Sequence, residues 1–465
     1  MLPLLTRPRP ALTVTPAQGA RGSRTVPSLV AVAVFVLYTA FALRQHHRFE
    51  TTGYDLGIFE QAVRAYAELR PPASEIRTAS APPGFSGEAY PLLGDHFHPI
   101  LILLAPLYLL VPHVETLLVA QAGLVAWSTY VVSRAARRHL PQPGAAVSLG
   151  LAYGCSWGLQ QLIGFDFHEV AFAVPLLALA CAAYLDGRWT AAAWWAAGLL
   201  LVKEDLGATA ALLGLLLMRR QRRVGLTLFL SASAATVLIV GVVIPALAPD
   251  GRYGYLTQQY AYGPFEGLPI KALTLMALLV ITAGLATRSP LVLLMVPTLA
   301  WRLTSPNPAY WNTELHYSAV LMPIAFLALI DVLRRGVTWP PVSVPLVVAV
   351  LLMPTQPLSS LATPDFWRDS PRQAAARTAV SLIPDGARVA ASNNLAPHLT
   401  GRATVHLVSE GVLSRRPDVN WIAADAHEGF PPGAFDSVLR AAAEEGGWRR
   451  VYADDGVLVL QRRSG

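Results

Sequence analysis

The chain has 465 residues, of which 54% are hydrophobic and only 14% are charged. About a quarter of the residues in a soluble globular protein are charged, and the apolar residues here fall into blocks separated by short polar pieces, so composition argues against a soluble fold and for a polytopic membrane protein. The formal net charge of +7 does not indicate a nucleic-acid partner, because the arginines gather at the ends of the apolar blocks, as on the cytoplasmic side of membrane proteins.

We predict a transmembrane part over residues 26–356, preceded by a cytoplasmic segment at 1–25. The first apolar run is expected to be a retained helix, and the alternative is a signal peptide cleaved near Ala40-Phe41-Ala42. Cys155 and Cys181 lie inside apolar blocks and indicate neither a disulfide nor a metal site. The sequence predicts about 11 transmembrane helices. In chain order they cover 26–43, 114–133, 145–163, 170–185, 189–202, 206–218, 224–247, 271–287, 289–303, 317–333 and 341–356.

Four basic clusters orient these helices: the N-terminal arginines, Arg134–Arg138, Arg219–Arg223 and Arg334–Arg335. With all four in the cytoplasm, an even number of spans separates each cluster from the next, as the geometry requires. The arrangement also requires that the apolar run Ile100–Val111, which prolines interrupt, does not cross the membrane. A run of about a dozen residues is too short to span comfortably, and we expect a re-entrant or interfacial segment.

This orientation places a large first loop, 44–113, on the outer face, together with 164–169, 203–205, 248–270, 304–316 and everything after about residue 357. Just after the first span, Ile58, Phe59, Ala62, Val63 and Tyr66 are spaced as on one face of a helix, which predicts a juxtamembrane helix.

Nearly all the clustered acidic and histidine residues fall in these outer loops. We interpret them as lining a solvent-filled cavity that opens to the outer face. The expected cavity-lining residues are Tyr54, Asp95, His96, Asp166, His168, Glu169, Glu204, Asp205, Asn307, Tyr310, Glu314 and His316.

Local sequence leaves several roles open. Lys203-Glu204-Asp205 between two apolar blocks is either a turn with an internal Lys–Glu pair or a charged cavity lining. The Asp166–Glu169 segment either caps the next helix or faces the cavity. A divalent metal is a further candidate, although two histidines in a loop are a weak signal without a third ligand. Its candidate ligands are Asp95, His96, His98, Asp166 and His168.

Residues 365–465 are more charged and are interrupted by proline and glycine. Ala387–Ser392 and Asn420–Ala424 are predicted buried strands, Phe435–Glu445 a helix and Val451–Leu460 a hairpin. We therefore expect a small α/β domain outside the membrane. Asn393-Asn394 is expected to form a turn, and contact with the cavity is the alternative.

Six motifs, in this order and spacing, resemble a bacterial family of predicted membrane proteins of unknown function, over about residues 30–430. They are Tyr54–Gln61, His96–Pro99, Phe165–His168, Leu201–Asp205, Ser305–Tyr310 and Ala391–Asn394.

That family is distantly similar to the C-type glycosyltransferases (GT-C), which use polyprenyl-phosphate-linked sugars as donors. The similarity implies a GT-C-like fold and a glycosyltransferase-like enzyme on the outer face of a bacterial cytoplasmic membrane, with Asp55 at the place of an acid that follows the first span. Asp55 would be the general base, and Lys203, Arg302 or His98 would bind the donor phosphate. Many of those enzymes have paired acids in the first loop, whereas Asp55 has no adjacent partner. Asp95, Asp166 or Glu169 would have to complete such a pair.

Two other functions fit the same residues. In a transporter or lipid flippase the charges would line a substrate path, and a non-catalytic membrane scaffold would retain them from an ancestral enzyme. The long first loop and the outer domain favour the enzyme. The sequence also shows no inverted repeat, a feature of many transporters.

Overall fold

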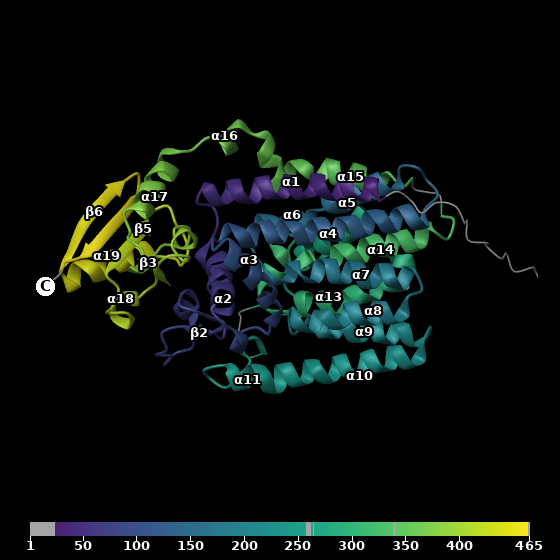
Figure 1. Cartoon of the computed structure of the whole chain (residues 1–465), viewed down its shortest axis with the longest axis horizontal. Helices are drawn as coiled ribbons and strands as arrows, with labels where there is room; N and C mark the ends of the chain where they lie inside the picture. Colours follow the sequence, from purple (N-terminus) through teal and green to yellow (C-terminus); the bar gives the residue numbers. More distant parts are fainter. Residues whose placement is uncertain (1–23, 257–261, 264, 338–340, 464–465) are drawn as a thin grey trace, which may run out of the picture.

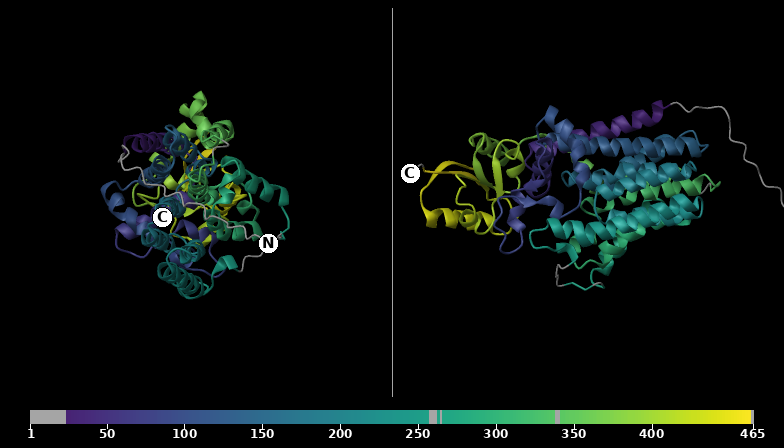
Figure 2. Two further views of the ribbon diagram at one scale, coloured as in Figure 1. Left: turned by 90° about the vertical axis from the view of Figure 1, so that its right-hand side faces the viewer. Right: turned by 60° about the horizontal axis from the view of Figure 1, so that its bottom comes forward.

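The computed structural model describes residues 24–256, 262–263, 265–337 and 341–463. A bundle of long helices carries a small α/β region at one end (Figures 1 and 2). Nearly all of the predicted cytoplasmic segment 1–25 and part of the predicted loop 248–270 lie outside the described residues.

Each apolar block predicted to cross the membrane contains helix, because a helix satisfies its own backbone hydrogen bonds where no water is present. The bundle contains α1 (Thr25–His47), α4 (Glu115–His139), α5 (Ala145–Gly154), α6 (Trp157–Gly164), α7 (Ala173–Leu185), α8 (Trp189–Ala197), α9 (Leu206–Met218), α10 (Arg222–Leu238), α11 (Ile244–Leu247), α12 (Leu268–Ile281), α13 (Val296–Thr304), α14 (Leu321–Leu333) and α15 (Val344–Leu352).

Among the described residues, four helical stretches are long and apolar enough to cross a membrane by length and composition. They are Thr25–His47, Glu115–His139, Arg222–Leu247 and His316–Leu333. The other apolar helices have 10–17 residues, fewer than the roughly 20 that a perpendicular span needs. The chain therefore has helices able to span a membrane, while about 11 spans, the number expected from hydropathy, stays a prediction.

Three of the basic clusters meet at one end of the bundle, which we call the arginine end (residues 134–140, 185–189, 219–223 and 333–336). Arg138 Nη1 lies 2.7 Å from Asp186 Oδ2, and Arg334 Nη1 donates to the Leu185 carbonyl at 2.7 Å. The Arg220 guanidinium lies 6.0 Å from the centroid of the Trp189 ring. Clusters far apart in sequence thus share one face, as the positive-inside rule predicts for a cytoplasmic surface.

The opposite end, which we call the polar end, gathers the predicted outer loops (residues 48–114, 164–169, 203–205 and 304–318). Segment 48–114 both leaves and re-enters the bundle here, because His46 at the end of α1 lies 3.9 Å from Glu115 at the start of α4. The intervening Pro99–Leu110 is helical, and its last part is α3 (Ala105–Leu110). It runs beside α2 near the polar end rather than along the bundle (Figure 1), in agreement with the predicted non-crossing segment.

The predicted juxtamembrane helix is α2 (Ile58–Ala67), which buries Ile58, Phe59, Ala62 and Val63. A short two-stranded sheet, β1 (Ala73–Ser74) with β2 (Tyr90–Pro91), follows in the same loop. The first loop is thus a folded layer over the polar end.

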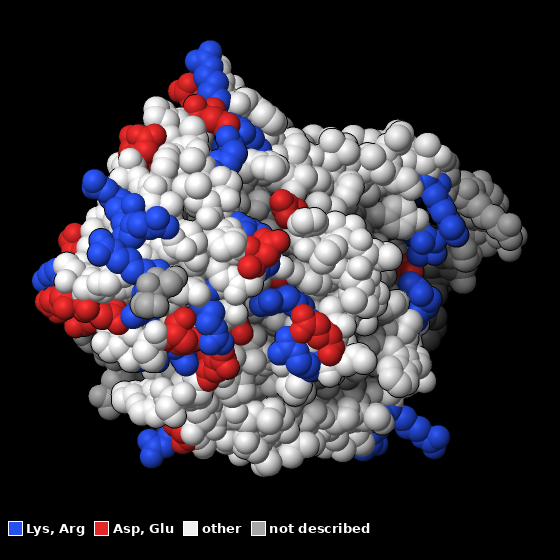
Figure 3. Space-filling model, turned by 60° about the vertical axis from the view of Figure 1, so that its left-hand side comes forward, with Lys and Arg blue, Asp and Glu red and all other residues white. Residues whose placement is uncertain are grey.

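The side of the bundle is apolar. Leu29, Val237, Leu273 and Leu351, from four different helices, are 62–72% exposed. Figure 3 shows few charged side chains over the helices and many of both signs over the C-terminal region. A belt of exposed hydrophobic side chains around a bundle is what contact with lipid requires.

The C-terminal region contains a five-stranded sheet in the order β4-β3-β5-β7-β6. Strand β3 (Arg388–Ala391) is parallel to both β4 (Thr404–Leu407) and β5 (Trp421–Asp425), whereas β7 (Val457–Arg462) is antiparallel to β5 and to β6 (Trp448–Asp454). Helices α17 (Pro371–Ser381), α18 (Val412–Arg415) and α19 (Ala434–Glu445) accompany the sheet, whereas α16 (Pro364–Trp367) lies beside α1, where Phe366 stacks on Phe41.

Three predictions for this region are confirmed: the two buried strands, the helix α19 and the hairpin. The prediction missed β4, which holds only four residues. Helix α17 begins with a capping box in which Ser370 and Gln373 exchange hydrogen bonds, a start signal that fits its Ser-Pro-Arg-Gln sequence.

The C-terminal region docks on the turn Gly53–Gly57, which precedes α2. Asn393, just after β3, accepts hydrogen bonds from Gly53 N at 2.6 Å on its carbonyl and from Tyr54 N at 2.7 Å on its side chain. A Cβ atom on Gly53 would lie 2.6 Å from the Cβ of Ala396, so only glycine permits this close approach. Asn393 lies in a turn, as expected, and the turn is also the point of contact between the two parts.

Cysteine labelling tests which end faces outward. In a background without Cys155 and Cys181, exposed positions Ser86 and Ala443 should react as cysteines with a membrane-impermeant maleimide added to intact cells. Exposed positions Gln142 and Gln221 at the arginine end should react only after lysis, because positive loops stay in the cytoplasm. Labelling of position 142 in intact cells would reverse the proposed orientation.

Candidate functional site

Four consecutive residues, Asp166-Phe167-His168-Glu169, contact several of the loops that form the polar end, and we call them the hub segment. They join α6 to α7, and Asp166 has a φ of +56°, a left-handed conformation that aspartate tolerates better than most residues. Asp166 Oδ2 accepts hydrogen bonds from Thr52 N at 2.8 Å and Thr52 Oγ1 at 2.7 Å. Asp166 therefore anchors the chain that leaves α1 and makes no cap on the following helix, one of the two roles left open for it.

His168 carries the contact to Asp55. Its Nε2 atom lies 3.2 Å from Asp55 Oδ1, and its ring stacks on that of His316 with centroids 3.7 Å apart. The Asp55 side chain keeps 24% of its surface exposed, whereas that of His168 keeps 5%. The pair thus presents one accessible carboxylate backed by a buried imidazole.

Glu169 carries the contact to Lys203. Lys203 Nζ lies 2.8 Å from Glu169 Oε1, and their side chains are 16% and 2% exposed. For a structural role of Lys203 the expected partner was its neighbour Glu204 or Asp205, and the observed partner, 34 positions earlier in the chain, was not predicted. Because Glu169 follows His168, the Lys203 ammonium and the Asp55 carboxylate are held by adjacent residues of the hub segment.

The two acids after Lys203 face other partners. Glu204 accepts hydrogen bonds from Tyr253 Oη at 2.7 Å and from Phe97 N at 3.0 Å, and its Oε1 lies 2.6 Å from His96 Nδ1. Asp205 accepts from Trp301 Nε1 at 2.9 Å. Burial and the nearby Lys203 would lower the pKa of His96, but the Glu204 carboxylate outweighs them and raises that pKa, which favours an ion pair between the two side chains.

The proposed metal ligands are not brought together. Asp95 forms a bidentate ion pair with Arg77, whose Nε donates to Asp95 Oδ2 at 2.8 Å and whose Nη2 donates to Asp95 Oδ1 at 3.2 Å. Burial would raise the pKa of Asp95, but His96 and Arg77 outweigh it and lower that pKa. Among the described residues no group of three or more His, Cys, Asp or Glu side chains is arranged to hold a metal ion, and the candidate set Asp95, His96, His98, Asp166 and His168 therefore does not form a ligand cluster there.

Of the three expected phosphate ligands, Arg302 is engaged by protein groups and His98 is buried. Arg302, fully buried, donates to the Tyr310 and Asn312 carbonyls and to Ser318 Oγ at 2.8–2.9 Å. Its guanidinium thereby holds the 304–318 loop and is not available to a ligand. Burial lowers the pKa of His98 despite the nearby Glu169, which favours the neutral imidazole and weakens the case for phosphate binding. Lys203 is the candidate that remains.

The loop itself is ordered by local contacts. Asn307 Oδ1 accepts from Ala309 N at 3.0 Å, and the Tyr310 ring lies edge-on to those of Trp301 and Tyr317 at 5.1 and 4.8 Å. His316 reaches the hub segment, as above, whereas Glu314 is exposed.

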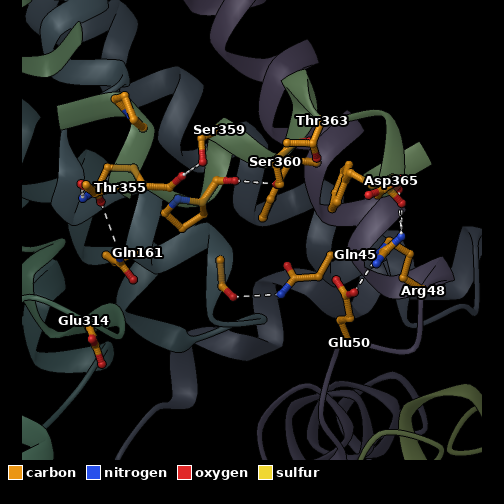
Figure 4. A pocket seen from close by; sticks show the side chains of 16 residues that line it. Gln45, Arg48, Glu50, Gln161, Glu314, Thr355, Ser359, Ser360, Thr363 and Asp365 are labelled. Atoms are coloured by element: carbon orange, nitrogen blue, oxygen red, sulfur yellow. Dashed lines mark hydrogen bonds and ion pairs between the residues drawn. The ribbon is translucent and has the colours of Figure 1, made fainter. Parts of the chain in front are cut away.

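The expected solvent-filled cavity takes a different form. Asp166, His168, Glu169, Glu204 and His316 are at most 5% exposed, and the rings of His168 and His316 stack on each other. An open groove of about 680 Å³ lies instead beside the outer turn of α1 (Figure 4). Of the twelve residues predicted to line the cavity, Glu314 alone borders this groove.

Sequence reasoning missed several residues that organise the site. Gln121, fully buried in α4, donates to the Asp166 carbonyl at 2.5 Å and accepts from His168 N at 3.0 Å. A single glutamine within an apolar span was the available signal, because such residues in membrane helices are costly unless paired. Thr52 and Arg77 gave no comparable signal, since both lie in a polar loop.

The raised pKa of Asp166 should make the stability of the protein depend on pH. Burial raises its pKa to about 7, Thr52 lowers it and Asp55 raises it further. Between the ordinary carboxyl pKa near 4 and this value, the folded state holds a proton that the unfolded state releases, so the free energy of unfolding falls as pH rises. Asp166→Asn, which tolerates the same backbone conformation, should lose less stability than the wild type between pH 5 and pH 8. Melting temperatures in detergent test this, and equal pH dependence in both proteins would contradict it.

The buried ion pair between Lys203 and Glu169 should contribute to the stability of the protein. Lys203→Met should destabilise the protein by about 3–5 kcal/mol, because a buried carboxylate loses its cation. The double variant Lys203→Met/Glu169→Gln should recover most of this loss, and Lys203→Arg should retain the pair. Thermal unfolding of the three variants gives the comparison; a single variant as stable as the wild type would show that the ion pair has no structural role.

The comparisons with known proteins agree with this architecture. The family described as "Predicted membrane protein (DUF2079)" matches residues 45–459. No curated protein matches the chain. The match covers most of the chain, including the hub segment, Asp55, Lys203 and the C-terminal sheet, and so this chain belongs to the DUF2079 family of predicted membrane proteins.

Proposed function

We propose that the chain is a glycosyltransferase-like membrane enzyme, of GT-C-like architecture, that transfers a sugar from a polyprenyl-phosphate donor to an acceptor hydroxyl. The observation that carries the proposal is the partly exposed Asp55 carboxylate, 3.2 Å from His168 and one residue along the hub segment from the Glu169–Lys203 pair. Adjacent residues of the hub segment thus hold a carboxylate that can accept a proton and a cation that can receive a phosphate.

The chemistry follows from these two groups. Asp55 takes the proton of the acceptor hydroxyl as its oxygen forms a bond to the anomeric carbon. The bond between that carbon and the phosphate oxygen breaks, and the electron pair leaves with the polyprenyl phosphate. Lys203 stabilises the negative charge of this leaving group. The imidazole of His168, whose Nε2 lies 3.2 Å from Asp55 Oδ1, orients the Asp55 carboxylate.

The location supports a lipid-linked donor. Asp55 and Lys203 lie where apolar helices end, so a lipid tail can remain among the helices while its phosphate reaches the polar end. We place this end on the outer face of a bacterial cytoplasmic membrane, because the arginine end is the basic one. The GT-C-like fold, the donor and the orientation all belong to this proposal.

Asp55→Asn tests the proposal. The amide keeps the size of the side chain and its contact with His168, so the melting temperature should stay near that of the wild type. It cannot act as a base, and turnover should fall by about 10²–10⁴-fold. The assay is sugar transfer or release from a polyprenyl-phosphate-linked donor by purified protein, with the melting temperature measured alongside.

The control for this experiment is Asp95→Asn, which removes an acid of the same loop that is paired with Arg77 and lies outside the Asp55 pair. It should change stability more than turnover per folded molecule. A folded and fully active Asp55→Asn protein would remove Asp55 from catalysis and overturn the role proposed for it.

A further inference from the structure

The groove beside α1 is a built cavity that the proposed reaction does not yet use. It has a volume of about 680 Å³ and lies between the outer turn of α1, the end of α6 and the segment 354–366. Figure 4 shows Glu314 toward one end and the pair Arg48–Glu50 toward the other. Side chains with amide or hydroxyl groups dominate its walls, among them Gln45, Gln161, Gln356, Ser359, Ser360 and Thr363.

The hydroxyl groups of the groove turn their protons away from it. Ser359 Oγ donates to the Gln356 carbonyl at 2.7 Å, and Ser360 Oγ donates to the Pro357 carbonyl at 2.7 Å. Thr363 Oγ1 donates to the Ser360 carbonyl at 2.7 Å. A hydroxyl that donates to the backbone keeps its lone pairs for a ligand, so these side chains act as acceptors.

The amides follow the same pattern. Gln45 Nε2 donates to the Gly164 carbonyl at 3.0 Å, and Gln161 Nε2 donates to Gln356 Oε1 at 3.2 Å. Within the described part of the chain the Oε1 atoms of Gln45 and Gln161 accept no hydrogen bond from protein. They remain available to a donor from outside.

The charges of the groove also favour a hydrogen-bond donor over an anion as the ligand. The groove has one basic lining residue, Arg48, against three carboxylates, Glu50, Glu314 and Asp365. Arg48 Nε bonds to Glu50 at 2.8 Å, and its Nη1 donates to three backbone carbonyls at 2.8–3.2 Å. A phosphate offers acceptors and negative charge, so it is unfavourable here, whereas a molecule rich in hydroxyl donors is complementary.

The groove also lies next to the candidate site. Gly164 and Glu314 border it, and the residues one and two positions beyond them, Phe165 and His316, stack at 5.6 Å. His316 in turn stacks on His168, the partner of Asp55. These stacked rings thus connect the wall of the groove with the Asp55–His168 pair.

We propose that this groove binds an uncharged, hydroxyl-rich saccharide, and that it holds the acceptor chain of the transfer reaction. The identification as acceptor rests on the proposed function, whereas the saccharide chemistry rests on the groove alone. The same chemistry occurs in a free oligosaccharide and in the head group of a glycolipid.

Saturation-transfer NMR on the full chain in phosphatidylcholine nanodiscs tests the binding. The probes are uncharged trisaccharides of glucose, galactose and mannose, with inorganic phosphate as the anionic comparison. Nanodiscs that contain a diglycosyl diacylglycerol form a second arm: a head group that occupies the groove should displace the free trisaccharide, and its failure to do so identifies the free sugar as the ligand. At least one trisaccharide or the glycolipid should bind, and phosphate should not.

Two substitutions form a matched pair. Ser360→Trp should fill the groove and reduce saccharide affinity by at least tenfold. Ser381→Trp, at an exposed serine of α17 whose hydroxyl also donates to a carbonyl three residues earlier, should leave it unchanged. Glu314→Lys should weaken saccharide binding by about tenfold, whereas Glu314→Gln keeps an acceptor oxygen and should stay within about threefold. Melting temperatures confirm that each variant is folded.

The outcomes separate the two proposals. Saccharide binding that Ser360→Trp leaves intact, phosphate binding in preference to saccharide, or no binding by any probe would overturn the groove proposal. A folded, fully active Asp55→Asn protein would overturn the proposed function while groove binding persists. If both hold, Ser360→Trp should raise the KM for a saccharide acceptor with little change in kcat, whereas Asp55→Asn lowers kcat.

Discussion

The hub segment is the element on which the arrangement of the polar end depends. Asp166 binds Thr52, His168 binds Asp55, and Glu169 binds Lys203, so consecutive residues connect the chain after α1 with the chain before α9. Apolar packing alone does not choose between helix neighbours in a membrane, because lipid tails are as apolar as leucine side chains. Buried charges do determine which helices are neighbours, because each buried charge is energetically costly unless it pairs with an opposite charge or a hydrogen-bond partner. The hub segment thus sets which helix ends meet.

The same constraint accounts for the division of the polar end into two chemical surfaces. His168 and Glu169 of the hub segment hold the Asp55 carboxylate and the Lys203 ammonium. The groove, whose lining includes neither Asp55 nor Lys203, presents acceptor atoms and carboxylates. A charged phosphate and a neutral saccharide would therefore be favoured at different surfaces of the polar end.

The C-terminal region takes part in the site through its backbone. Asn393 holds the turn that carries Tyr54 and Asp55, and the Tyr54 ring lies edge-on to Phe430 at 5.3 Å. The parallel strands β3 and β5 end toward this contact, and the carboxyl edge of such a sheet is where ligands commonly bind in α/β proteins. Removal of the region would leave the Gly53–Gly57 turn without its hydrogen-bond partners.

Much of the architecture could be predicted from sequence, because it depends on composition over a window. Apolar blocks of helical length, arginines at their ends and the amphipathic spacing of α2 are local properties, and all of them agree with the structure. The non-crossing segment followed from charge parity, and the contact between His46 and Glu115 agrees with it. Pairings could not be predicted in this way. Lys203 and Arg302 were expected as phosphate ligands and five residues as candidate metal ligands, whereas the structure pairs Lys203 with Glu169 and bonds Arg302 to the 304–318 loop.

The sequence by itself determined that the chain belongs in a membrane, which residues form helices and which end of the bundle collects the arginines. It also determined which residues carry ionisable groups into apolar surroundings. Only the tertiary structure decided the partner of each such group, the separation of Asp55 from the groove and the role of Asn393. The physical reason is that a charged residue in an apolar segment requires a partner, but the local sequence does not identify that partner. The partner is whichever group the packing of distant helices brings within about 3 Å.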